Sequence, residues 1–127
     1  MPEKHLFEYA VIRIVPRVER EEFINVGVIL YGKSLKFLDL KYEVNEEKLS
    51  HFSDQLDIPE IREYLNAFAY ICSGSADSGP IGKLDLPSRF RWLTATRSTI
   101  VQSSKVHSGF CDQPEMALKD LFTKFVL

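Results

Sequence analysis

The chain has 127 residues, of which 45% are hydrophobic and 27% charged, and its formal net charge is −2. This length predicts a single domain over residues 1–127, and the near-neutral charge argues against a general binder of polyanions. Two cysteines are too few for a disulfide scaffold, and no segment is apolar over the length of a signal peptide or a membrane span. We therefore expect a cytoplasmic protein with no membrane association.

Residues 7–15 (FEYAVIRIV) predict the first strand, because they are β-branched and aromatic and end at Pro16. The odd-numbered face of this strand carries Arg13 among apolar side chains. A charged group there must pair with an acid, reach the edge of the sheet, or bind an anion.

Residues 23–31 (FINVGVILY) form an almost unbroken apolar run that stops at Gly32. Such a run predicts a strand buried on both faces at the centre of a sheet. Its even-numbered residues are all aliphatic and are expected to form the main core face. Asn25 and Gly27 on the other face suggest either a β-bulge at the glycine or a group that approaches the backbone closely.

The rest of the chain predicts alternating strands and helices bounded by polar turns. The expected elements are a strand over 35–42, a short helix over 46–56, a helix over 58–73, a mobile loop over about 73–82, a strand over 99–103, a turn at 107–109 and a helix over 113–126. Asp57 and Asp112 have the spacing of helix caps, and Gly74 ends the longer helix. Residues 83–97 fit either a short helix or an extended segment.

These elements predict an α+β fold, with a mainly antiparallel sheet of four or five strands. The two principal helices, 58–73 and 113–126, are expected to pack on one face of the sheet, the aliphatic one.

Charge is unevenly distributed along the chain. Residues 43–63 hold seven acidic and two basic residues, whereas 83–105 hold five basic residues and one acidic residue. The basic stretch could hold a phosphate or another anion through its arginines and hydroxyl groups, and Trp92 could stack on a base. Alternatively, Phe90 and Trp92 belong to the core and the arginines pair with the acidic stretch.

His107 is the best candidate for a general acid or base, because it lies in a polar segment and histidine titrates near neutral pH. Cys111 precedes a predicted helix, where a reactive thiol is the alternative to a buried structural one. Asp39 and Lys41 have the order found in many metal-dependent nucleases, but the helical frame of those enzymes is missing. We expect no metal site and no cofactor.

Three segments carry a resemblance to a known family: YAVIRIVP (9–16), EFINVGVILYG (22–32) and RFRWLTATRSTIVQSSKVHSGFCDQPE (89–115). Together they resemble the bacterial domain-of-unknown-function family numbered three thousand and thirty-seven. The resemblance implies no reaction. It implies a HipA-like protein of the kinase fold as a neighbour and partner, in a toxin–antitoxin-like setting, and the signature positions Arg13, Asn25, Gly27, Arg89, Trp92, Arg97, Ser98, Thr99 and His107.

Three functions remain open at this point. The first is an accessory module that binds a protein partner and could also hold a phosphate-bearing ligand. The second is a small enzyme acting on a phosphate ester or nucleotide, with His107 as acid or base. The third and least favoured is nucleic-acid binding. The candidate ligand-binding residues are Arg13, Asn25, Arg89, Arg91, Trp92, Arg97, Ser98 and Thr99.

Overall fold

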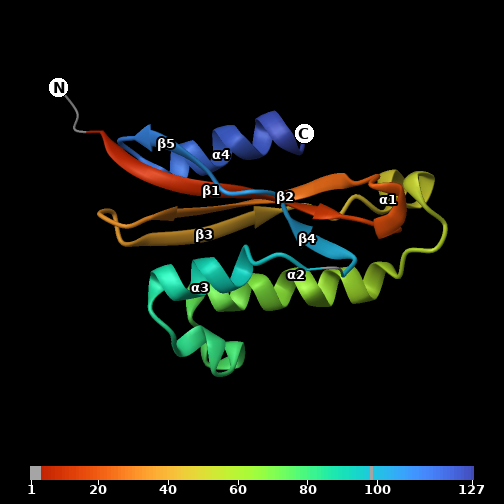
Figure 1. Cartoon of the computed structure of the whole chain (residues 1–127), viewed down its shortest axis with the longest axis horizontal. Coiled ribbons are helices and arrows are strands. Elements are labelled where there is room, and N and C mark those ends of the chain that lie inside the picture. Colours follow the sequence, from red (N-terminus) through yellow and green to blue (C-terminus); the bar gives the residue numbers. More distant parts are fainter. Residues whose placement is uncertain (1–3, 98) are drawn as a thin grey trace.

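The structure of the protein, a computed structural model, describes residues 4–97 and 99–127, without the side chains of Val18 and Asp77. A five-stranded antiparallel sheet lies between helices (Figure 1), which confirms the predicted α+β fold. The strands and α-helices are β1 (His5–Ile14), β2 (Ile24–Gly32), β3 (Phe37–Tyr42), α1 (Glu46–Phe52), α2 (Ile58–Ser73), α3 (Leu86–Leu93), β4 (Val101–Ser103), β5 (His107–Cys111) and α4 (Pro114–Phe125). Over the described ranges, no helix has the length and apolarity needed to cross a membrane.

The sheet runs in the order β3-β2-β1, and both β4 and β5 pair with the outer side of β1. β4 pairs with the end of β1, and β5 pairs with its beginning, from His5 to Tyr9. The turn predicted at 107–109 is therefore wrong, because these residues begin β5. Gly109 allows this pairing, since a Cβ atom there would lie 2.7 Å from Cζ of Phe7.

A β-bulge interrupts the pairing of β1 with β2. Ile12 pairs with Gly27, but the next residue, Arg13, pairs with Asn25, so Val26 is an additional residue on β2. A bulge reverses the faces on which the following side chains lie. The bulge suggested by Asn25 and Gly27 is thus confirmed.

The bulge changes which residues of β2 share a face. Ile24 and Val26 lie in the same apolar cluster as Ile29, whereas Val28 and Leu30 lie in a second cluster. The expectation of one aliphatic face formed by the even-numbered residues is wrong for this reason. β2 is apolar on both faces, and each face needs its own cover.

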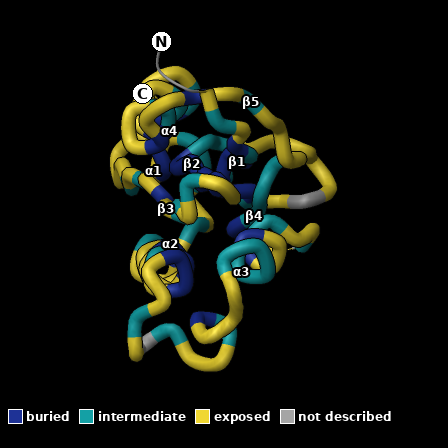
Figure 2. Tube along the Cα trace, turned by 90° about the vertical axis from the view of Figure 1, so that its left-hand side faces the viewer, coloured by how far each residue is buried: buried dark blue, intermediate teal, exposed yellow. Residues whose placement is uncertain are grey.

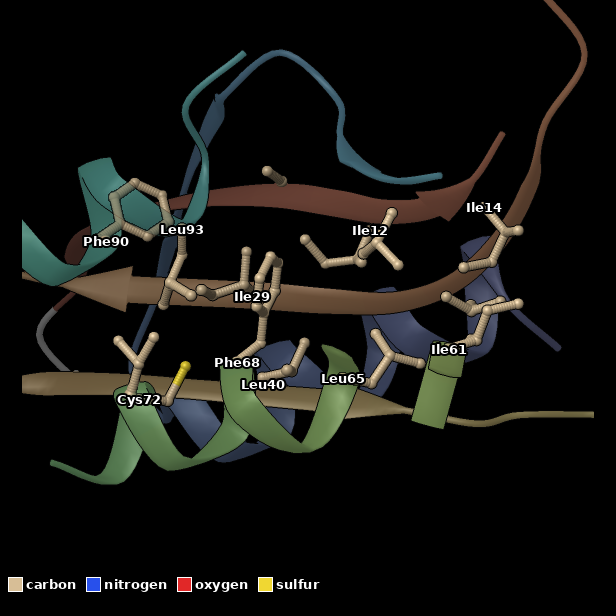
Figure 3. Close-up of a cluster of buried hydrophobic side chains, with 14 of the residues drawn as sticks. Ile12, Ile14, Ile29, Leu40, Ile61, Leu65, Phe68, Cys72, Phe90 and Leu93 are labelled. Atoms are coloured by element: carbon tan, nitrogen blue, oxygen red, sulfur yellow. The ribbon is translucent and has the colours of Figure 1, made fainter. Parts of the chain in front are cut away.

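The helices supply that cover from opposite sides (Figures 1 and 2). Leu65 of α2 and Leu93 of α3 are fully buried against Ile12 and Ile29 (Figure 3). Phe122 of α4 belongs to the second cluster. The prediction that the two principal helices pack against the sheet holds, but they do so on opposite faces.

The ends of α2 follow the predicted signals. The carboxylate of Asp57 accepts a hydrogen bond from the backbone N–H of Glu60 at 3.1 Å, and Gly74 ends the helix at a φ of 67°.

At α3, the helical alternative for residues 83–97 holds, with Asp85 as the N-cap of the helix. At α4 the predicted cap Asp112 is wrong by one position, since Gln113 is the N-cap. The mobility expected for residues 73–82 stays a prediction.

Both thiols, Cys72 and Cys111, are free and buried. Burial raises the pKa of Cys72 to about 12, and burial also raises the pKa of Cys111. The environment of Cys111 is therefore the opposite of the one that activates a thiol.

We expect neither thiol to react with Ellman's reagent in the native protein at pH 8, because both thiols are buried and their raised pKa lowers the fraction of reactive thiolate. Two thiols per chain should react after unfolding in guanidinium chloride. The absorbance of the thiolate released from the reagent measures the number of reactive thiols in the native and in the unfolded protein. Rapid labelling of the native protein that disappears in a Cys111→Ser variant would contradict the prediction.

Candidate functional site

A groove of about 760 Å³ opens at the end of the sheet where β1 begins and β2 turns into β3, beside α3. The β2–β3 turn and α3 lie at the left of Figure 1. We name this groove the basic groove. It is lined by Leu6, Glu8, Tyr31, Lys33, Ser34, Lys36, Pro87 and Arg91. These residues come from β1, β2, the β2–β3 turn and α3, so only the folded chain forms the groove.

The charge of the groove is positive. Lys33, Lys36 and Arg91 are exposed cations, and Glu8 is the one acidic group among the lining residues that the structure describes. None of the three cations forms an ion pair with any residue that the structure describes. Unpaired cations on a concave surface attract anions, and Arg91 can hold a carboxylate or phosphate through two parallel hydrogen bonds.

Tyr31 forms the buried floor of the groove. Its ring stacks on Phe90 of α3, with 5.3 Å between the ring centroids. Burial raises the pKa of Tyr31, and the charge of Glu8 adds to this effect, while Arg91 opposes it. The phenol is therefore neutral at physiological pH and presents a hydroxyl group, not a charge.

Two large apolar side chains lie exposed beside the groove. Leu6 of β1 pairs across the sheet with Phe110 of β5, so both side chains lie on the same face. Leu6 is 52% exposed and Phe110 68% exposed. We call these two residues the apolar pair, and they extend the apolar side of the groove onto the open sheet.

Arg89 and Arg97 are directed at helix ends. Nη1 of Arg89 donates to the carbonyl oxygens of Ile71 and Cys72 at the C-terminus of α2, at 2.9 and 3.1 Å. Nη1 of Arg97 donates to the carbonyl oxygen of Leu93 at the end of α3, at 3.1 Å. Cations at these positions satisfy free carbonyl groups and oppose the negative end of the helix dipole.

Trp92 is associated with Arg97 and not with the groove. The guanidinium carbon of Arg97 lies 4.5 Å from the ring centroid of Trp92, and the indole packs edge-on against Phe68 of α2. Burial lowers the pKa of Arg97. These contacts hold α3 against α2.

Arg13 and Asn25 lie together on the other face of the sheet, at the bulge. The guanidinium carbon of Arg13 is 3.9 Å from the ring centroid of Phe23, and burial lowers its pKa. Nδ2 of Asn25 donates to the carbonyl oxygen of Phe125 at the end of α4, at 3.1 Å. Nε of Arg13 and Oδ1 of Asn25 are buried and have no hydrogen-bond partner within residues 4–97 and 99–127.

His107 lies on this same face, opposite Tyr9 in the pairing of β5 with β1. Its ring is exposed, with its centroid 5.5 Å from that of Tyr9. The hydroxyl of Thr99 donates to the carbonyl oxygen of Val101. Ser98 lies outside the described residues.

The candidate residues predicted from the sequence thus do not form one site. Arg13, Asn25 and His107 lie on the α4 face. Arg89, Trp92 and Arg97 hold α3 and α2 together on the other face, and Arg91 alone among the candidates that the structure describes lines the basic groove. Sequence reasoning missed Lys33 and Lys36. The signal was available, since two lysines within a four-residue hairpin turn project from the end of the sheet.

No group of three or more His, Cys, Asp or Glu side chains that could hold a metal ion occurs in the described part of the chain.

The family described as protein of unknown function (DUF3037) matches residues 9–126. No curated protein and no solved structure matches the chain. The chain belongs to the DUF3037 family.

Proposed function

We propose that this protein is a non-catalytic accessory module that binds a protein partner at the apolar pair and the adjoining basic groove. The observation that carries the proposal is the exposure of Leu6 and Phe110, two large apolar side chains side by side on a sheet face. Adjacent exposed apolar side chains that continue into a groove form the kind of surface that a protein partner covers. Aromatic and arginine side chains such as Phe110 and Arg91 are also enriched in protein interfaces.

The separation of the candidate residues supports binding over catalysis. An enzyme that transfers or hydrolyses a phosphate group needs its acid or base within hydrogen-bond reach of the groups that stabilise charge. His107 lies on the α4 face, whereas Arg91 lines the groove on the opposite face. Arg13 shares the face of His107, but it lies further along β1 than Tyr9, the residue that pairs with His107, and its guanidinium group packs on the ring of Phe23. Arg89 and Arg97 donate to helix carbonyl groups.

The first partner to test is the HipA-like protein of the kinase fold that the sequence resemblance implies. The two proteins are co-expressed, and the complex is purified through a tag on the partner and sized by gel filtration. We expect a stable complex with the wild-type chain. A Leu6→Thr/Phe110→Thr variant should lose it, because threonine preserves the strand but removes the apolar contact.

The matched control is Met116→Gln, which removes an exposed apolar side chain from α4 on the opposite face. It should leave the complex intact, and the melting temperature of both variants should stay close to that of the wild type. Retention of the complex by the Leu6/Phe110 variant would refute this interface. Recovery of the tagged partner without the wild-type chain would refute the HipA-like partner.

A further inference from the structure

We infer that the basic groove binds an acidic, extended segment of the partner polypeptide. The carboxylates of that segment lie against Lys33, Lys36 and Arg91, and a large apolar side chain of the same segment packs on the apolar pair. This inference rests on the proposed function and names the chemistry of the partner.

The charges of the groove favour an acidic occupant. Three cations face the groove against one carboxylate, and none of them has an ion-pair partner in the described chain. A neutral or basic occupant would take these cations out of water without compensation, which costs free energy. Carboxylates supply the missing partners, and Arg91 can bind one of them at two points.

The shape of the site favours a polypeptide over a small anion. The groove measures about 760 Å³, which exceeds what a phosphate or a sulfate ion fills. Leu6 lines the groove and belongs to the apolar pair, so the charged and apolar surfaces are continuous. A small anion would use only the cations, whereas an acidic segment with one large apolar residue uses both surfaces.

A second copy of this chain is a weaker candidate for the occupant. α2 presents Glu60, Glu63 and the exposed Tyr64, which have the required chemistry. However, these residues and the groove are different surfaces, so copies would join head to tail. Such a contact generates open chains of molecules unless the rotation happens to close a ring. A separate polypeptide that binds the groove forms a complex that does not grow further.

The test is selection of short random peptides, displayed on phage, against the intact wild-type protein. We expect enriched peptides that combine several Asp or Glu residues with one large apolar residue. The strongest of them is then synthesised with a fluorescent label, and its Kd is measured by anisotropy. Binding should weaken as salt is raised from about 0.05 to 0.5 M, because the contacts are between exposed charges.

Charge reversal provides the decisive comparison. Lys33→Glu/Lys36→Glu/Arg91→Glu should raise the Kd at least about tenfold, because it turns attraction into repulsion. The matched control, Lys83→Glu/Lys105→Glu/Lys119→Glu, makes the same change in net charge at exposed positions outside the groove and should change the Kd by less than about twofold. The melting temperatures of both variants confirm that they fold.

Several outcomes would overturn the inference. They are enrichment without an excess of acidic residues, no enrichment at all, an equal loss of binding in both charge variants, and tight binding of inorganic phosphate with no enriched peptide. Oligomers that grow with concentration and disappear in Glu60→Lys/Glu63→Lys would identify a second copy instead. If the co-purified complex forms but the selection fails, the proposed function stands and only the acidic segment is refuted.

Discussion

Gly27→Val is expected to lower the free energy of unfolding by about 3 kcal/mol. A Cβ atom at this position would lie 2.9 Å from the carbonyl oxygen of Lys41 and 3.0 Å from Cβ of Tyr42, on the neighbouring strand. Neither atom can move away without separating β2 from β3. Urea denaturation followed by circular dichroism measures the change.

The matched comparison is Gly27→Ala against Gly32→Ala, two glycines of the same strand. At Gly32 the nearest atom to an added Cβ is Cδ1 of Leu35, at 3.1 Å, and this side chain can rotate. We expect Gly27→Ala to be clearly the more destabilising of the two. Equal urea midpoints would show that the approach of β3 to the backbone of Gly27 does not limit stability.

Arg89→Met is expected to lower the free energy of unfolding by about 2 kcal/mol, because the variant loses charge-assisted hydrogen bonds to two carbonyl oxygens at the end of α2. Methionine keeps most of the apolar length of the side chain, so the loss reports on the guanidinium group. Thermal unfolding and urea denaturation measure the effect.

Arg91→Met is the control for this prediction, on the same helix two residues further along. Arg91 is exposed in the groove and makes no hydrogen bond with the described residues, so its loss should change stability by less than about 0.5 kcal/mol. The same variant should weaken binding of the partner, which Arg89→Met should not do in samples that remain folded. Similar stability losses for both variants would contradict the distinct roles assigned to these arginines.

The two arginines illustrate how little the residue type alone says about a site. The sequence predicts a basic stretch, and Arg89, Arg91 and Arg97 are all present in it. The side chains of Arg89 and Arg91 diverge because the two residues lie two positions apart on α3, one facing α2 and the other facing the β2–β3 turn. Only the packing of α3 against α2 decides which guanidinium group forms hydrogen bonds within the fold and which one stays available to a ligand.

Local signals along the sequence by themselves determined much of the fold. The bounds of α2 follow from Asp57 at its start and Gly74 at its end, and β1 and β2 follow from apolar runs. These signals are reliable because a cap or an apolar repeat acts over a few neighbouring residues.

The tertiary structure alone decided the rest. The strand β5 exists because His107–Cys111 pairs with β1 about a hundred residues earlier in the chain. The additional residue Val26 in β2 places the even-numbered side chains before and after the bulge on opposite faces of the sheet. The basic groove likewise joins β1, the β2–β3 turn and α3. Strand register and the meeting of distant segments depend on the free energy of the whole fold, which no local stretch of sequence contains.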